Sequence, residues 1–280
     1  MIWLVRQELL FLRVLSRAFL NPVRNWRFFL GIWLPAFALE SYLANIAYDL
    51  FDDAFFDAKG WVAWWSIGVL LVAMLVIATM IAIAWHRVVL LQSLSTREVF
   101  NRPPVFRYAG TLLAGAVLGY VVYTVAILVP LAIVDMDIYD LLMWRPENQL
   151  LDLLLITAEN FVLDNGVAII VQSVMIVFGM NAVGLATKLD KGWRNSWTFS
   201  LRALLPIFLS VFTLYLIVEM LRLSCSLVFF AWAPTDPSSG LSYLGRLNYV
   251  EIAASAALSI LFLSLLTEWY REFLTAKAPT

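Results

Sequence analysis

The chain has 280 residues, of which 62% are hydrophobic and 14% are charged. Soluble globular domains carry roughly 25% charged residues, so this composition excludes an ordinary soluble domain and is typical of a polytopic membrane protein. The formal net charge of −1 says little, because the distribution of charge between the two sides of a membrane protein matters more than its sum.

The first twenty residues predict an amphipathic helix in the cytoplasmic interface of the membrane. Arg6, Arg13 and Arg17 are spaced i, i+7 and i+11, so they share one helical face, and apolar side chains fill the remainder. A basic face of this kind binds anionic lipid headgroups. We expect the helix to hold the N-terminus in the cytoplasm, with docking of a partner protein as the alternative. Interspersed charges and the lack of a small-residue cleavage site do not fit a cleavable signal peptide.

Six further segments are each long and apolar enough to cross the roughly 30 Å hydrocarbon core as a helix. They predict an all-α polytopic membrane bundle, a single membrane domain over residues 1–280, with spans at 28–50, 60–85, 109–134, 166–187, 203–233 and 249–270. The stretch 150–163 is too short and too polar to span, and we expect it to form a second interfacial helix.

The connections between these segments differ sharply in charge. The N-terminal segment, the second and fourth connections and the C-terminal tail hold fifteen Lys and Arg residues, and the remaining connections hold three. The positive-inside rule therefore predicts that both termini are cytoplasmic, which agrees with an even number of spans.

Three charged residues lie deep inside apolar segments: Glu40 in the first span, and Glu219 and Arg222 in the fifth. Tyr215, Glu219, Arg222 and Ser226 are spaced i, i+4, i+7 and i+11, so they share one helical face that should point into the bundle. Small residues surround Glu40 on its own face, which favours close packing of the first and fifth spans. Two interpretations remain open: a charge cluster that sets helix register, or a midplane site for a substrate or proton.

Other features indicate helix packing and no chemistry. Gly115 and Gly119 form a GxxxG pattern, which is typical of closely packed membrane helices. The single Cys225 and the single His86 cannot supply a Cys/His metal site, and no catalytic motif is present. We therefore expect a protein that is not an enzyme and that has no metal or cofactor. His86 should lie at headgroup level, hydrogen-bonded to lipid phosphate or water.

The run AWHRVVLL, where the second span ends, resembles a segment of uncharacterised multi-pass inner-membrane proteins of proteobacteria. In these proteins a Trp-His-Arg span end is followed by Leu-rich sequence, and the match covers 83–91. The resemblance implies a bacterial inner membrane and transfers no activity or functional residue.

Two functions fit these observations. The first is a non-enzymatic subunit or assembly factor of an inner-membrane complex, whose partners are anionic lipid headgroups and other membrane subunits, with no nucleic acid. The alternative is a transporter for a small solute or proton that uses the cluster of Glu40, Glu219 and Arg222. Only isolated prolines interrupt the spans, whereas carriers commonly contain paired broken helices, and this favours the first function slightly.

Overall fold

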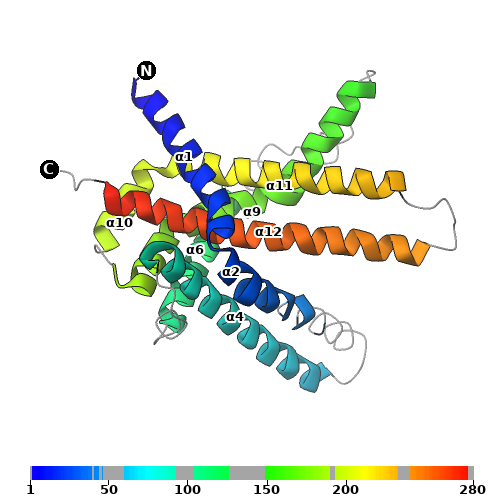
Figure 1. The fold of residues 1–280 in the computed structure, drawn as a ribbon, viewed down its shortest axis with the longest axis horizontal. Helices are drawn as coiled ribbons and strands as arrows, with labels where there is room; N and C mark the ends of the chain where they lie inside the picture. The colour runs from blue at the N-terminus through cyan, green and yellow to red at the C-terminus, as the bar shows by residue number, and fades with distance from the viewer. Residues whose placement is uncertain are drawn as a thin grey trace.

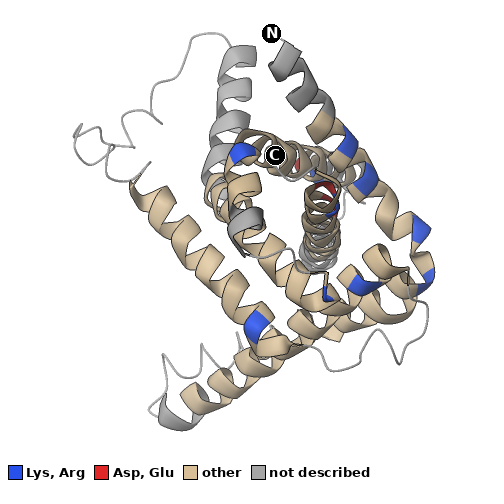
Figure 2. Ribbon diagram, turned by 90° about the vertical axis from the view of Figure 1, so that its left-hand side faces the viewer, with Lys and Arg blue, Asp and Glu red and all other residues tan. Residues whose placement is uncertain are grey.

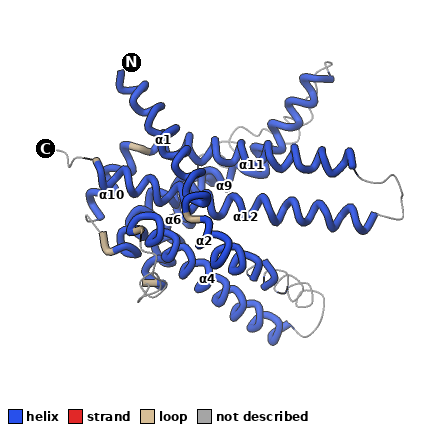
Figure 3. Tube along the Cα trace, in the orientation of Figure 1, coloured by secondary structure: helices blue, strands red, loops and turns tan. Residues whose placement is uncertain are grey.

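The part of the chain that the computed structural model describes is almost entirely helical, with short turns between helices and no strand (Figure 3). The backbone is described for residues 2–39, 41–43, 46, 60–92, 104–125, 149–189, 193–232 and 240–276. Side chains are described for 10–39, 41–43, 46, 64–92, 104–125, 165–189, 198–225 and 252–276.

Each helix follows from an apolar run or an amphipathic pattern in the sequence. The helices are α1 (Ile2–Arg24), α2 (Trp26–Phe28), the π-helix η1 (Phe29–Trp33), α4 (Gly60–Leu91), α6 (Val105–Tyr123), α9 (Gln149–Thr187), α10 (Trp193–Arg202), α11 (Leu204–Trp232) and α12 (Gly240–Thr275). Within the described residues, five segments are long and apolar enough to cross a membrane: Trp64–Leu91, Val105–Tyr123, Asn165–Thr187, Leu204–Cys225 and Ile252–Thr275.

These five segments correspond to the second to sixth predicted spans. The first predicted span, 28–50, is helical up to residue 39, and much of its second half lies outside the described residues. The stretch 150–163, where an interfacial helix is predicted, is helical and is continuous with the following span, because α9 runs without a break from Gln149 to Thr187. Its position at the membrane interface stays a prediction. Its acidic residues are compatible with helix, and the run contains no proline that would end one.

The helices form two pairs that meet at one end and diverge at the other (Figure 1). The α11 and α12 helices run side by side. The segment that contains α2 and η1 extends away from them together with α4, against which Phe28 packs. Both chain termini lie toward the end where the pairs meet. We call this the basic end; α4 and α12 finish there, at Leu91 and Thr275, and α11 begins there at Leu204.

The α6 and α9 helices complete the bundle through a very close contact. A Cβ atom added to Gly119 would lie 2.7 Å from Val171 Cα, and one added to Gly115 would lie 3.2 Å from Met175 Cα. Both glycines of the GxxxG pattern thus lie where α6 crosses α9. Their missing side chains let the two backbones approach, as small residues commonly do in membrane helices.

The N-terminal helix α1 lies across α12 and α11, attached by charged and polar contacts. Arg13 Nη2 lies 2.6 Å from Glu272 Oε2, and Arg17 Nη1 lies 2.9 Å from Glu272 Oε1. Asn21 Nδ2 donates a hydrogen bond of 2.9 Å to Glu268 Oε1. The basic face of α1 therefore has an intramolecular partner on α12. Its binding to anionic headgroups stays a prediction, and the Arg6 side chain lies outside the described residues.

Basic side chains gather toward the same end of the bundle. Figure 2 looks at this end and shows Lys and Arg residues spread around it, with acidic residues close to the centre. The buried acid Glu268 is paired with Arg271, which also donates a hydrogen bond of 2.9 Å to the carbonyl oxygen of Val89. This contact ties the ends of α4 and α12 together.

Candidate functional site

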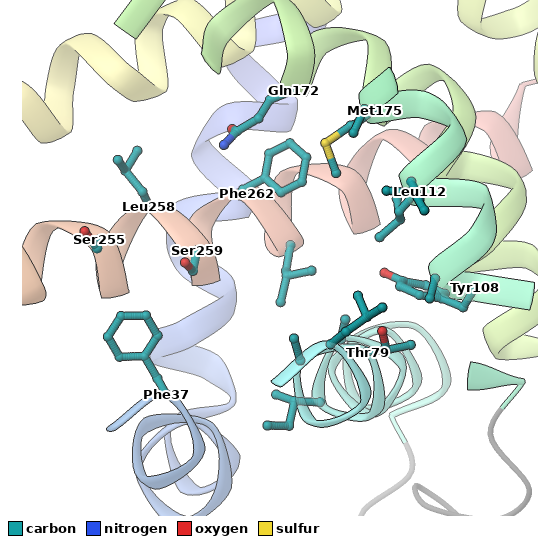
Figure 4. Close-up of a pocket in the computed structure, with 18 of the residues that line it drawn as sticks. Phe37, Thr79, Tyr108, Leu112, Gln172, Met175, Ser255, Leu258, Ser259 and Phe262 are labelled. Carbon is teal, nitrogen blue, oxygen red and sulfur yellow. The ribbon is translucent and has the colours of Figure 1, made fainter. Parts of the chain in front are cut away.

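A cavity of about 570 Å³ lies where the two helix pairs separate. Its walls come from η1 and the residues after it, α4, α6, α9, α11 and α12, and most of them are apolar. No Lys, Arg, Asp, Glu or His residue lines it, within the part of the chain that is described. The polar side chains in the wall are Thr79, Tyr108, Gln172, Ser255 and Ser259, which Figure 4 labels, and Tyr215. Ligand pockets are commonly about 300–1,000 Å³, apolar, and provided with a few polar groups, so this cavity has the size and lining of a binding site.

The apolar wall includes an aromatic surface built by local helix geometry. Trp33 is the last residue of η1, and Phe37 follows one turn later. Their rings stack, with centroids 5.3 Å apart and an interplanar angle of 14°. Trp33 is buried, and both residues line the cavity. Single π-helical turns often occur at functional sites, and here one precedes the aromatic wall.

Among the described polar side chains that line the cavity, Gln172 is the one with a buried atom that lacks a hydrogen-bond partner. Its amide Oε1 is buried and has no hydrogen-bond partner among the described residues. Figure 4 shows the amide directed into the space bounded by Leu258 and Phe262. Buried polar groups in proteins are nearly always paired, and an unpaired one is especially unfavourable within a membrane. Gln172 is therefore placed to bind a molecule that occupies the cavity.

A second cavity of about 260 Å³ adjoins the first and contains the intramembrane charges. Glu219 and Arg222 line it with Asn165, and three residues line both cavities: Tyr215, Ser255 and Leu258. Arg222 Nη2 lies 2.5 Å from Glu219 Oε1, and Arg222 Nε donates to the same oxygen at 3.1 Å. The two side chains are 29% and 19% exposed, so they are partly enclosed by neighbouring helices.

The charges of the fifth span thus compensate each other within one helix. Glu40, which we expect near them, lies outside the described residues, and so does the side chain of Ser226. A three-membered cluster consequently stays a prediction. Tyr215 is on the same face as the pair and is buried, as its spacing predicts, and it connects the pair to the larger cavity.

The expectation that His86 lies among lipid headgroups is wrong. Its side chain is completely buried; Nδ1 lies 2.7 Å from Thr267 Oγ1, and Nε2 lies 2.6 Å from the hydroxyl oxygen of Tyr108. Thr267 donates its own hydroxyl hydrogen to the carbonyl oxygen of Leu263. Nδ1 therefore carries the hydrogen donated to Thr267, and Nε2 accepts the hydrogen of Tyr108. His86 thereby joins α4 to α6 and α12, and its partner Tyr108 also lines the cavity.

A fully buried layer separates the cavity from the basic end. We call it the plug, and its largest side chains have no exposed surface: Trp85, His86, Met180, Leu266 and Trp269. Arg87 Nε donates to the carbonyl oxygen of Ala186 at 2.7 Å, which joins α4 to α9. The hydroxyl of Tyr270 donates to the carbonyl oxygen of Leu189 at 2.7 Å, which joins α12 to the end of α9. The cavity is thus closed at the basic end by packing and hydrogen bonds.

Of the polar residues that line the cavity, most are not singled out by the sequence pattern. Thr79, Ser255 and Ser259 belong to residue types that are common in apolar helices, where a hydroxyl can bond to its own backbone. Gln172 is the detectable signal, because a Gln side chain within a span requires partners. Glu219 and Arg222 were found because charge in a span is rarer still.

The fold and the cavity define a helical membrane protein with an internal space of ligand size. Comparison with protein-family models, with curated proteins and with solved structures gave no match. The function is therefore inferred from the cavity and from the helices that surround it.

Proposed function

We propose that this chain is a carrier of the bacterial inner membrane that binds a small solute in the central cavity and moves it across the bilayer. The observation that supports this is a ligand-sized cavity located between two diverging helix pairs and closed at one end by the plug. Carriers bind their substrates near the middle of the membrane and expose the site to one side at a time. The chemistry of the solute is unchanged during such a step, so no catalytic residue is required.

The orientation follows from the charge of the connections. We place the basic end in the cytoplasm, with six spans and both termini on that side, since Lys and Arg are retained there. The diverging ends of the helix pairs then face outward. On this assignment the described conformation is open toward the outside, and α1 lies at the cytoplasmic interface beside anionic headgroups.

Buried polar groups without hydrogen-bond partners, in and beside the plug, support the proposal that the plug can open. The indole Nε1 atoms of Trp85 and Trp269 and the Oε2 atom of Glu268 are buried without partners among the described residues. Each missing hydrogen bond destabilises the closed arrangement by about 1–3 kcal/mol. A packed layer that contains unpaired polar groups therefore separates more readily than a layer in which every polar group is paired.

Labelling of an introduced cysteine from each side of the membrane tests the carrier. In a Cys225→Ser background, Ser259→Cys places a thiol in the cavity wall, and Val69→Cys places a control thiol on an exposed apolar surface. We expect a membrane-impermeant maleimide to label position 259 from the outside and to leave position 69 unlabelled. The double variant Tyr270→Phe with Arg271→Ala removes the hydrogen bonds to the carbonyl oxygens of Leu189 and Val89. We expect this variant to be labelled at position 259 from the cytoplasmic side as well. Labelling from one side only in both proteins would contradict alternating access.

The second candidate is a subunit or assembly factor of an inner-membrane complex. It is favoured by the basic surface, where Arg24, Arg107 and Lys188 form no ion pair with a described acid. Such a surface attracts acidic protein segments as well as anionic lipid. Purification in mild detergent followed by mass spectrometry tests it, with Arg24→Gln and Arg107→Gln as comparison. A partner that is retained by the wild type and lost from the double variant would support a subunit.

A further inference from the structure

We propose that the molecule bound in the central cavity is uncharged and largely apolar, and that it carries one hydroxyl-like group that pairs with the Gln172 amide. This inference rests on the proposed carrier function, and it adds the chemical class of the solute. It depends on three features of the cavity as the described residues form it: no charged side chain in the lining, an aromatic wall, and the buried, unpaired Oε1 atom of Gln172.

The described part of the lining offers no counter-charge to an ionic solute. No charged side chain lines the cavity among the described residues, and the nearest charges, Glu219 and Arg222, already pair with each other in the adjoining space. An ionised ligand in the larger cavity would be removed from water without a counter-charge, which is strongly unfavourable in a low-dielectric interior.

The apolar residues of the wall favour a ligand whose main part is apolar. The stacked rings of Trp33 and Phe37 line the cavity, as do Phe262 and Met175. Aromatic faces and a methionine thioether provide a broad, polarisable surface for rings or alkyl chains. The volume of about 570 Å³ accommodates a molecule with two fused rings together with water or a short chain.

Gln172 selects the polar group. A glutamine amide has two hydrogens to donate and one oxygen that accepts, and the described structure leaves the oxygen unpaired. Rotation about the last side-chain torsion exchanges the positions of oxygen and nitrogen, because this torsion is soft. A ligand hydroxyl matches either arrangement, since it donates to the oxygen or accepts from the nitrogen. A group that only accepts is matched by the nitrogen alone and leaves Oε1 unpaired.

Equilibrium dialysis of the full-length protein in detergent micelles tests this, with empty micelles subtracted. The probes share one ring system: 2-naphthol, 2-methoxynaphthalene, which has no donor, and 2-naphthoate, which is anionic at neutral pH. We expect 2-naphthol to bind about 3- to 10-fold more tightly than 2-methoxynaphthalene, the usual range for one hydrogen bond. Binding of 2-naphthoate should be weaker than that of 2-naphthol by at least about tenfold.

Substitutions in the cavity wall test whether the probes bind in the central cavity. Gln172→Leu, or Gln172→Met if the first does not accumulate, should bring the preference for 2-naphthol over 2-methoxynaphthalene close to one. Ser173→Ala is the matched control, because Ser173 donates to its own helix at Ile169 and does not line the cavity. The substitution Ser259→Phe should abolish binding of all three probes by filling the space.

The results separate this inference from the carrier proposal. Tightest binding of 2-naphthoate, equal binding of 2-naphthol and 2-methoxynaphthalene, or a preference unchanged by the Gln172 variants would overturn the inference, even if labelling of position 259 shows alternating access. The expected probe preferences together with labelling from one side only would uphold the solute class and reject the carrier. Binding of the probes that survives Ser259→Phe would place them outside the cavity and overturn the inference as well.

Discussion

Gly119 in α6 lies so close to Val171 in α9 that an added Cβ atom would stand 2.7 Å from Val171 Cα. The contact fixes the distance between two helices that both line the cavity, since Leu112 of α6 and Gln172 of α9 contribute to its wall. A single missing methyl group therefore influences the shape of the candidate site. The backbone of Val171 cannot turn aside as a flexible side chain would.

Gly119→Ala should destabilise the protein by about 1–3 kcal/mol, the usual effect of forcing extra volume into a packed contact. Gly110→Ala is the matched control in the same helix, because nothing lies within 4 Å of its added Cβ atom. Thermal unfolding of both variants in the same detergent measures the difference. Equal stability of the two variants would show that α6 and α9 are not held at this distance.

The buried acid of α12 should depend strongly on its partner. Glu268 has no exposed side-chain surface, and Arg271, which pairs with it, is 29% exposed. Arg271→Met leaves a buried carboxylate without its counter-charge and should destabilise the protein by about 3 kcal/mol, at the lower end of the range for buried pairs. Adding Glu268→Gln should restore much of the loss, because a neutral amide requires no counter-charge.

Folded yield after size-exclusion chromatography and the unfolding temperature measure the Arg271 effect. Arg202→Met is a suitable control, since Arg202 also lies at the basic end but is exposed and forms no ion pair with a described residue. Similar behaviour of the Arg271 and Arg202 variants would mean that Glu268 is stabilised without its arginine.

The ion pair of the fifth span should behave as a unit. Arg222→Leu leaves Glu219 partly enclosed and unpaired, and we expect less folded protein in the membrane. The double variant Glu219→Leu with Arg222→Leu should recover most of it, because apolar replacement of a whole enclosed pair is often neutral or stabilising. Quantitative immunoblotting of membranes, followed by thermal unfolding, checks this.

A double variant that folds well also distinguishes the two roles of the pair. If Glu219 and Arg222 only set packing, position 259 should keep its labelling pattern from both sides. Loss of that pattern in a stable double variant would assign the pair to the transport step. A double variant less stable than Arg222→Leu would contradict mutual compensation.

The proposed orientation in the membrane can be tested directly by labelling position 140, which lies outside the described residues. Asp140→Cys, in a Cys225→Ser background, should react with a membrane-impermeant maleimide added outside, because 135–165 is assigned to the outer surface by its low content of Lys and Arg. Lys188→Cys is the control at the basic end and should react only from the cytoplasmic side. The reverse pattern at the two positions would invert the topology.

Much of the fold was predictable from the sequence. Five of the six predicted spans coincide with helices that are long and apolar enough to cross a membrane, because each is a continuous apolar run. Their ends were less predictable. The α4 helix continues through His86 and Arg87 to Leu91, since these polar side chains find partners on other helices.

The candidate site was predictable only in part. The spacing of Tyr215, Glu219 and Arg222 indicated one shared face, and all three line one small cavity. The larger cavity beside it was not predictable, because its walls come from segments that are far apart in the chain. The basic residues on α1 were expected to contact anionic lipid or a partner protein, whereas Arg13 and Arg17 pair with Glu272 of the same chain, more than 250 residues away.

The sequence by itself determined that this is a membrane protein of long helices, because the transfer of an apolar run into hydrocarbon depends on the residues of that run alone. It also determined which charges require an explanation within the bilayer. Only the tertiary structure decided which polar groups are satisfied. His86 is paired with Thr267, 181 residues away, whereas Gln172 faces a cavity with its Oε1 unpaired. The physical reason is that a hydrogen bond requires two groups about 3 Å apart, and in a helical bundle that distance is set by how separate helices pack.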